Sequence, residues 1–469
     1  MAFNDISFLF IFFPAALLLH AVMPMVGKNI LLLILSLIFF AWGSPEYVLL
    51  LILSIVFNYF TGLQMGKQKE EKDEKGLQFT LWSAVIVNLL LLGFFKYWGF
   101  VLSNVNALLG TSIPVRQLSM PLGISFFTFS ILSYLFDVYR DKAPAAKNIL
   151  DFSLFVAFFP KLVSGPIVQY ADFAAQIHDR KLTQAKFGAG CRLFLIGLAK
   201  KVLLSNTIGT TFYAVTALAP DAISVVTAWL GAISYSLMLY FDFSGYSDMA
   251  IGIAQMFGFN FNKNIDYPSL SASVSEFWRR WHISLGAWFR DYVYIPLGGS
   301  RVEQKKIIRN LLIVWGLTGI WHGANWNFIF WGLFHGGILL LEKFVLKSFL
   351  EKVPKFLKIP ATVILVIIGW VFFFSPDLGS AFLWLGRMFG IGAHGFLDPT
   401  AVYYFSASST ILAIGAIAAY PIGAKLGNNV YHWGKTAVAL SVLWFGLLLI
   451  LCIAGMMSST YSSFLYFQF

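Results

Sequence analysis

Residues 309–343 read RNLLIVWGLTGIWHGANWNFIFWGLFHGGILLLEK. Apolar side chains fill both halves of this stretch, and the polar segment WHGANWN (321–327) divides them nearly in the middle. Arg309 lies at one end and Glu342-Lys343 at the other, both in basic surroundings, so both ends are expected on the cytoplasmic face of a membrane. The stretch therefore predicts a helical hairpin with His322 at its tip.

The composition of the whole chain places this hairpin in lipid. Of 469 residues, 58% are apolar and 12% are charged, and the mean hydropathy is +0.75. Soluble domains carry about 25% charged residues, so a water-soluble fold would lack roughly half of its usual charged surface. The 18% aromatic content, the two cysteines and the aperiodic glycines also exclude disordered, disulfide-rich and collagen-like classes.

Apolar stretches recur along the chain at lengths typical of membrane helices. A helix rises ~1.5 Å per residue, so about 20 residues cross a ~30 Å hydrocarbon core. Most of these stretches would cross the membrane once, whereas 222–258 and 309–345 are long enough to enter the membrane and return to the same side. The sequence thus predicts one all-α polytopic membrane domain over 1–469, with about 11–13 membrane helices that include re-entrant or half-spanning segments such as 158–168. The stretches are 6–23, 30–43, 47–66, 79–95, 120–139, 149–168, 189–207, 222–258, 309–345, 359–375, 401–422 and 436–457.

The charge distribution indicates orientation in the membrane rather than nucleic-acid binding. The chain has 33 Lys and Arg against 22 Asp and Glu, a formal net charge of +11. The positive-inside bias places the basic connections in the cytoplasm and the connections 208–221 and 459–469, which lack Lys and Arg, outside. The basic connections are 67–75, 140–147, 180–186, 279–309 and 343–358.

The cation-rich segment 260–309 allows two interpretations. Its arginines, including Arg279, Arg280 and Arg290, alternate with Trp, Tyr and Phe. Such a mixture suits a lipid headgroup interface, where the rings enter the acyl chains and the charges stay in water. The same guanidinium groups also match the phosphates of a cytoplasmic substrate.

His322 is the first candidate for a catalytic residue. It lies thirteen residues from Arg309, which places it ~20 Å from the cytoplasmic edge. A chain that crossed the membrane fully would leave it buried as well. Imidazole suits general-base catalysis near neutral pH, and a site away from water protects an activated acyl group. The alternative is a structural hydrogen bond to a neighbouring helix, although His282 and His335 in similar surroundings favour a site.

Two carboxylates, Asp242 and Asp248, fall inside the apolar stretch 222–258 and need partners there. They either pair with Arg or Tyr to fix helix positions, or take part directly in chemistry. Ion coupling in a transporter is a further alternative, because transporters use buried charges beside broken helices. The sequence has no HExxH, CxxC, Walker or GxSxG motif, so no metal site, ATPase or serine hydrolase is expected.

Four blocks of sequence carry a resemblance to a known family. Taken in chain order, they resemble the membrane-bound O-acyltransferases, and within them the bacterial branch that O-acetylates alginate. The ending FLYFQF (464–469) is similar to that branch as well. The blocks are 120–129 with 137–140; 241–252; 276–284 with 288–292 and 294–299; and 321–324 with 326–328.

The resemblance implies acyl transfer through a tunnel at the centre of the membrane helices. The family histidine of the Trp-His-Gly motif is His322, and the second family histidine is His282. No cofactor is expected to be bound, and acetyl-CoA is implied as the acyl donor. Contact with substrate is expected from Trp321, Asn325, Arg279, Arg280, Arg290, Asp242 and Asp248.

The resemblance also implies a location and partners. These are a bacterial inner membrane with its lipids, an extracytoplasmic polysaccharide, and a secreted or membrane-anchored acetyltransferase. Transfer of D-alanine from a carrier protein to teichoic acids is the related alternative. Ser130 stands where the branch often has Gln, and Lys161 and Gln169 around the turn Ser164-Gly165-Pro166 are further differences.

Overall fold

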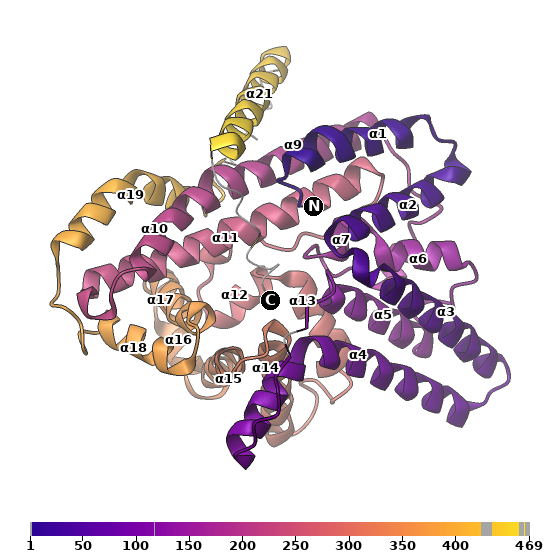
Figure 1. Ribbon diagram of the computed structural model, residues 1–469, viewed down its shortest axis with the longest axis horizontal. Helices are drawn as coiled ribbons and strands as arrows, with labels where there is room; N and C mark the ends of the chain where they lie inside the picture. The colour runs from indigo at the N-terminus through magenta and orange to yellow at the C-terminus, as the bar shows by residue number, and fades with distance from the viewer. Residues whose placement is uncertain (1, 117, 424–433, 459–463, 465–469) are drawn as a thin grey trace. The chain divides into compact units, whose positions relative to one another are not determined.

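The computed structural model describes residues 2–116, 118–423, 434–458 and 464. Every regular element in those residues is helical, which confirms the all-α prediction (Figure 1). The chain divides into two compact units. The first comprises Met1–Phe194 and Ala250–Asn262, and the second comprises Leu195–Met249 and Lys263–Phe469.

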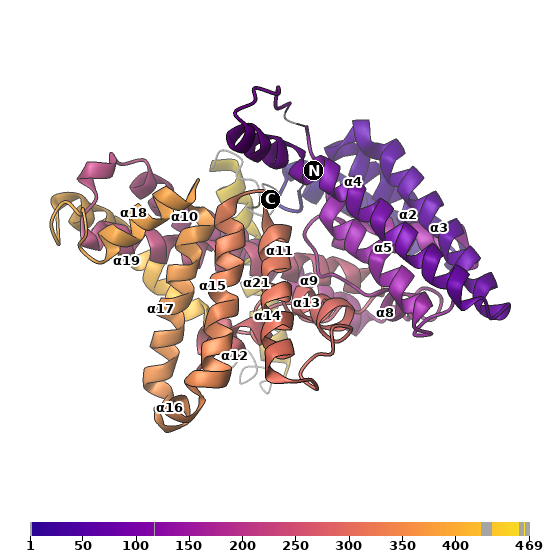
Figure 2. The same cartoon turned by 90° about the horizontal axis from the view of Figure 1, so that it is seen from below.

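The first unit contains the amino-terminal helices, of which α2 to α5 pack side by side (Figures 1 and 2). Gly62 on α3 makes this packing close, because a Cβ there would lie on the hydroxyl of Tyr134 from α5. The Tyr134 ring in turn packs 4.5 Å from the ring of Phe152, between ring centroids. The elements are η1 (Phe8–Phe12), α1 (Phe13–Val22), α2 (Met25–Gly43), η2 (Pro45–Tyr47), α3 (Val48–Glu70), α4 (Glu74–Leu109), α5 (Ile124–Tyr139), α6 (Ile149–Ala157), α7 (Phe159–Leu162) and α8 (Tyr170–Ala174).

The stretch 149–168 is broken, as its Gly and Pro residues predict. The chain leaves the helix after α6, forms the single turn α7 and then runs irregularly to α8, with residues 154–168 all buried. Gly123 begins α5 with φ +66°, and a Cβ there would lie 2.2 Å from the carbonyl oxygen of Leu162. Irregular backbone of this kind is tolerated at membrane depth where protein surrounds it.

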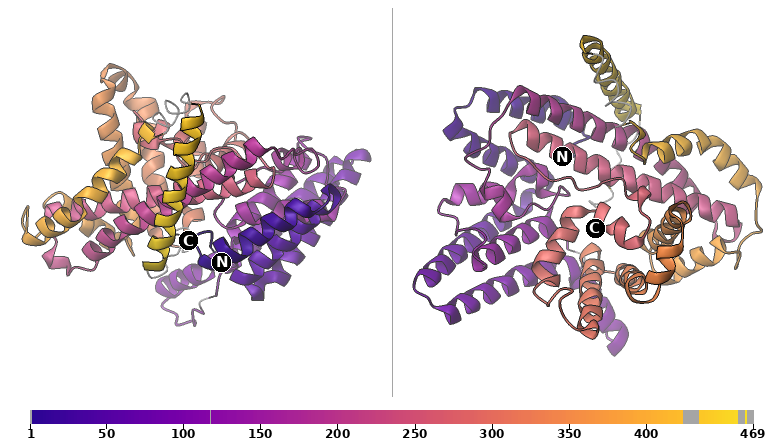
Figure 3. Two further views of the ribbon diagram at one scale, coloured as in Figure 1. Left: turned by 90° about the horizontal axis from the view of Figure 1, so that it is seen from above. Right: turned by 180° about the vertical axis from the view of Figure 1, so that it is seen from behind.

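The second unit contains the carboxy-terminal helices, and two helices, α9 (Gln184–Ala199) and α11 (Val225–Met256), contribute to both units. Figure 3 shows the long helices of this unit from two further sides. Its other elements are η3 (Lys200–Ser205), α10 (Asn206–Thr216), η4 (Pro220–Ala222), η5 (Pro268–Leu270), α12 (Val274–Arg280), α13 (Ile283–Phe289), η6 (Arg290–Tyr294), α14 (Gln304–His322), α15 (Trp326–Leu340), η7 (Leu341–Val345), α16 (Lys347–Lys352), α17 (Lys355–Phe374), α18 (Leu378–Met388), α19 (Pro399–Ala418) and α21 (Lys435–Ser458).

Eight helices in the described residues are long and apolar enough to cross a membrane, and two shorter apolar helices accompany them. The larger number expected from the sequence included stretches that fold as short or interrupted helices, such as 149–168. One expectation was wrong: 222–258 does not go in and return, because α11 runs without a break for 32 residues. The stretch 222–258 contains no Gly-Pro pair that would break the helix and reverse the chain.

The predicted hairpin at 309–343 is confirmed. α14 ends at His322, α15 begins at Trp326, and the two helices pack side by side (Figure 2). Glycines permit the close approach: a Cβ on Gly319 would lie 2.3 Å from the carbonyl oxygen of Phe328, and one on Gly332 would lie 2.3 Å from that of Trp315. The hairpin therefore depends on contacts between the two helix backbones.

We predict that Gly332→Ala destabilises the hairpin, because the new methyl group meets backbone rather than a flexible side chain. Overpacking of this kind costs about 1–3 kcal/mol. Gly337→Ala on the same helix is the matched control, since a Cβ there has no atom within 4 Å. Thermal unfolding of the two variants in detergent measures the difference, and equal midpoints would contradict close packing at Gly332.

Candidate functional site

His322 lies in an aromatic shell at the tip of the α14–α15 hairpin. Its side chain is buried, with 3% of the residue exposed. The ring centroid lies 4.8 Å from Trp331, 4.9 Å from Trp321 and 5.1 Å from Phe373 of α17. His322 thus occupies an apolar site of the kind expected for a catalytic imidazole shielded from water.

His282 lies at a sharp turn between α12 and α13. Its backbone has φ +48° and ψ +52°, a left-handed conformation that non-glycine residues rarely adopt. Its ring lies 4.6 Å from Phe243 on α11 and 6.0 Å from Trp321. Burial lowers the pKa of His282 to about 3, so the imidazole is neutral at physiological pH.

Trp321 is the residue that both candidate histidines share. Its ring packs against the rings of both His322 and His282, and the residue is buried. The structure therefore brings together His322, His282 and Trp321, three of the residues predicted to form the site. Asn325 has a different position: it caps the start of α15 and donates a 2.9 Å hydrogen bond to the carbonyl oxygen of Pro376. It holds the hairpin tip in place.

Asn264 holds the His282 turn, a role that sequence analysis missed. This fully buried amide accepts hydrogen bonds from the backbone N–H and the hydroxyl of Ser284, and donates to the Ser247 hydroxyl on α11. The backbone carbonyl oxygen of Asn264 also accepts a hydrogen bond from the N–H of Ile283. Because no motif marks Asn264, its position beside the turn is visible only once the loop has folded.

Glu342 fixes α12 to the hairpin, a second role that the sequence did not reveal. Its carboxylate accepts hydrogen bonds from the backbone N–H groups of Val274 and Ser275 and from the Ser275 hydroxyl. These are free donors at the start of α12, where negative charge is favourable. The spacing Ser273-x-x-Glu276 is a capping-box motif, which marks the start of α12 in the sequence. It gives no sign that Glu342 also bonds to this helix start.

His335 is separated from His322 by the side chain of Trp331. Its ring is fully buried among tryptophans, 4.9 Å from Trp278 and 5.1 Å from Trp331. Trp331 therefore touches both His322 and His335. A Cβ on Gly369 would lie 2.6 Å from the Nε2 atom of His335, so this glycine makes room for the ring.

The two aspartates predicted to contact substrate are held in ion pairs. Asp242 pairs with Lys201 at 2.5 Å, and Asp248 pairs with Lys200 at 2.6 Å. Both lysines come from the π-helical turn η3, and the Lys201–Asp242 pair is almost completely buried. The partners are lysines rather than the Arg or Tyr that we expected. This arrangement supports the structural interpretation, in which the pairs hold η3 against α11.

The three arginines predicted to contact substrate do not converge on one point. Arg279 is exposed, Arg280 pairs with Glu276 and Asp266, and Arg290 pairs with Asp291. The Arg290 side chain is 62% exposed. The exposed Arg279 thus presents its charge outward, the charge of the exposed Arg290 is balanced by Asp291, and Arg280 braces the loop before α12.

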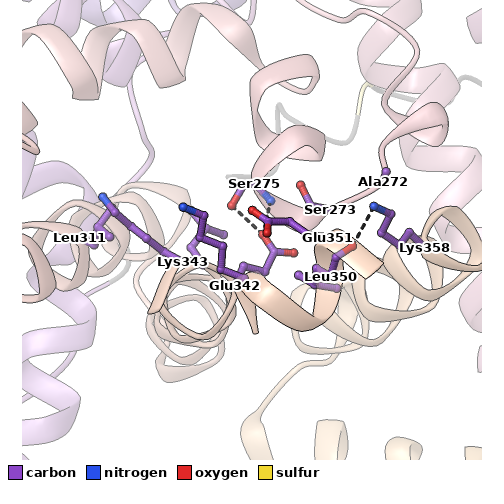
Figure 4. A pocket seen from close by; sticks show the side chains of 11 residues that line it. Ala272, Ser273, Ser275, Leu311, Glu342, Lys343, Leu350, Glu351 and Lys358 are labelled. Carbon is purple, nitrogen blue, oxygen red and sulfur yellow. Dashed lines mark hydrogen bonds between the residues drawn. The ribbon is translucent and has the colours of Figure 1, made fainter. Parts of the chain in front are cut away.

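A cavity of about 510 Å³ lies beside the start of α12, as Figure 4 shows. Lys343, Lys347 and Lys358 contribute cations to its wall, and Glu342 bonds to Ser275 within it. Lys358 donates a 3.0 Å hydrogen bond to the carbonyl oxygen of Leu350, which fixes its ammonium. The cavity lies in a connection that the sequence places in the cytoplasm.

Comparison with known proteins gives the family. The profile of the membrane-bound O-acyltransferase family matches residues 36–379. A probable alginate O-acetylase from Azotobacter vinelandii is 39% identical over 90% of this chain and 85% of its own. A peptidoglycan O-acetyltransferase from Helicobacter pylori is 34% identical over 100% of this chain and 98% of its own. A teichoic acid D-alanyltransferase from Bacillus subtilis is 29% identical over 57% of this chain and 68% of its own.

The chain belongs to the membrane-bound O-acyltransferase family. Membership confirms the resemblance read from the four sequence blocks, and it decides between an enzyme and a transporter. Together with the eight apolar helices, it makes this chain a multi-pass membrane acyltransferase. The matched region includes His282, His322 and His335.

We predict that Lys201→Met destabilises this acyltransferase by about 3–5 kcal/mol, because it leaves the Asp242 charge buried without its ion-pair partner. In the double variant Lys201→Met/Asp242→Leu no charge remains, so most of the stability and near-normal acyl transfer should return. Thermal unfolding and acyl transfer in detergent measure both. A double variant that folds but has lost transfer would show that Asp242 acts in the chemistry.

Proposed function

We propose that this protein transfers acetyl groups from cytoplasmic acetyl-CoA, across a bacterial inner membrane, to an extracytoplasmic polysaccharide. Relatives that align over most of the chain are named for O-acetylation, for example of alginate in Azotobacter vinelandii and of peptidoglycan in Helicobacter pylori. The observation that carries the proposal is the burial of His322 at the hairpin tip beside a second histidine.

In the proposed reaction, His322 is the general base. Its imidazole takes the proton from an acceptor hydroxyl as the oxygen attacks the thioester carbonyl carbon. The new C–O bond forms, the C–S bond breaks, and the imidazolium returns the proton to the leaving thiolate. A positioned base of this kind contributes about 10²- to 10⁴-fold to the rate.

The surroundings of His322 support transfer to an acceptor rather than hydrolysis. Trp321, Trp331 and Phe373 cover the ring, which limits the water that can compete with the acceptor. Neutral His282 also packs against the Trp321 ring, with 6.0 Å between the ring centroids. We assign His282 to positioning the Trp321 ring and the substrate beside it.

The cations of the second unit support a phosphate-bearing donor. Coenzyme A carries phosphates, which Arg and Lys side chains recognise. The exposed Arg279 and Arg290 and the lysines of the cavity in Figure 4 lie in connections that the positive-inside bias places in the cytoplasm. We assign them to the donor, which fits supply of acetyl groups from inside the cell.

The acceptor hydroxyl belongs either to the polysaccharide or to a secreted or membrane-anchored acetyltransferase that passes the acetyl group on. The relatives named for D-alanylation of teichoic acid support a second donor class, a D-alanyl carrier protein, but they align over about half of the chain. Supplying purified protein with labelled acetyl-CoA or labelled D-alanyl carrier protein separates the two functions.

We predict that His322→Ala lowers transfer from labelled acetyl-CoA to polysaccharide by about 10²-fold or more, because the base is removed. The variant should still insert into the membrane, since one buried ring is lost from an intact hairpin. His394→Ala is the control, because His394 is an exposed histidine of the same unit. Normal acetylation by folded His322→Ala protein would rule out the mechanism.

We predict that Lys347→Gln raises the KM for acetyl-CoA by about two- to five-fold and leaves kcat nearly unchanged. The magnitude is that of losing one solvent-exposed ion pair, about 0.5–1 kcal/mol. Lys75→Gln, at an exposed lysine of the first unit, is the control. Steady-state kinetics with acetyl-CoA give both constants, and equal KM values in the two variants would remove the cavity from the donor site.

A further inference from the structure

Ser130 and Lys161 form a close pair in the first unit, away from the histidines. Ser130 lies on α5 and Lys161 on the short turn α7. The Nζ atom of Lys161 lies 2.8 Å from the Oγ atom of Ser130, and each residue is 3% exposed. The pair therefore has the contact distance of a nucleophile and its base.

In the part of the chain that the structure describes, no carboxylate forms an ion pair with the Lys161 amine. The ion pairs found among the described residues do not include it, and the Nζ atom instead lies 4.3 Å from the centroid of the Phe155 ring. α7 lies outside the eight apolar helices long enough to span. Because the amine is buried, its uncharged form, which can accept a proton, costs less to place there than the ammonium.

The backbone on both sides fixes the two side chains. A Cβ on Gly165 would lie 2.5 Å from the Cα of Lys161, so the turn after α7 folds tightly back on this residue. On α5, the Ser133 hydroxyl donates to the carbonyl oxygen of Ser130 and accepts from the N–H of Tyr170. The pair is thus held between two elements that have little freedom to separate.

We propose that Ser130 and Lys161 are a serine–lysine dyad, a second acyl-accepting site at which a short acyl group from a thioester or activated ester is bound covalently to the Ser130 oxygen. Serine–lysine pairs serve as nucleophile and base in enzymes that lack a histidine triad. Because both side chains are buried, the proposed acyl group is a short one such as acetyl. The proposal does not depend on the His322 site.

The acylation of Ser130 needs only the two side chains and the acyl donor. The uncharged Nζ atom of Lys161 takes the proton of the Ser130 hydroxyl as its Oγ attacks the carbonyl carbon. The C–O bond of the serine ester forms and the C–S bond of the thioester, or the C–O bond of an ester reagent, breaks. The Lys161 ammonium then gives its proton to the leaving group. In the second half, Lys161 takes the proton of an acceptor hydroxyl as its oxygen attacks the ester carbonyl carbon, the C–O bond to Ser130 breaks, and the Lys161 ammonium returns the proton to the Ser130 oxygen.

The test uses the full-length protein in detergent with isotope-labelled p-nitrophenyl acetate, followed by peptide mapping. We expect label on the Ser130 peptide, released by alkaline hydroxylamine as an ester is. Lys161→Met should slow labelling by about 100-fold, the lower end of the effect of a positioned base. Ser130→Ala should abolish it. Ser125→Ala, at a buried serine of the same helix, should label like wild type.

Two further variants separate loss of the dyad from misfolding and from loss of the His322 site. Ser130→Cys retains a nucleophile and should be labelled as a thioester, which guards against misfolding of Ser130→Ala. His322→Ala should be labelled at Ser130 as wild type is, so failure of the dyad is distinguishable from failure of the acetyl transfer proposed above. Stable amide label on the Lys161 nitrogen, no label on Ser130, or labelling unaffected by Lys161→Met would overturn the proposal and leave the pair a structural hydrogen bond.

Discussion

The close contact between α14 and α15 is the constraint on which the candidate site depends. A side chain on Gly319 or Gly332 would collide with the backbone of the facing helix. Because both residues are glycine, the two helices can approach closely enough to form a tight hairpin. That approach puts His322 at the end of α14, directly before the turn, and carries Trp331 of α15 to within 4.8 Å of its ring. Lipid supplies no hydrophobic force between helices, so such small-residue packing is a main source of their association.

The second candidate histidine depends on a different kind of support. His282 occupies a left-handed backbone conformation, which persists only where its surroundings enforce it. Asn264 bonds the residues that follow the turn, and Glu342 bonds the start of the helix that precedes it. Since Glu342 follows α15, the end of the hairpin helix is also tied to the α12 segment. Polar contacts fix the turn that carries His282, and helix packing fixes the hairpin that carries His322. Both histidine rings therefore pack against Trp321.

Sequence analysis predicted the hairpin, its tip and the role of membrane helices, because those features follow from local hydrophobicity and from charges at the ends of stretches. It also selected His282 and His322, through local motifs that resemble a family. It did not find Asn264 or Glu342, whose partners lie up to 68 residues away in the chain, and it did not identify the lysine partners of Asp242 and Asp248. Length alone was also a poor guide at 222–258, where one continuous helix replaces the expected reversal. Tertiary contacts of this kind leave no periodic signal.

The central claim is that the acyl carbon is transferred beside His322 at the hairpin tip. An experimental structure of the protein with a non-reactive acetyl-CoA analogue bound tests it most directly. The account predicts the acyl group beside the His322 ring, near Trp321 and within hydrogen-bonding reach of an acceptor oxygen placed against the imidazole, with coenzyme A phosphates on cations of the second unit. An acyl group bound elsewhere, with His322 packed against side chains alone, would contradict it.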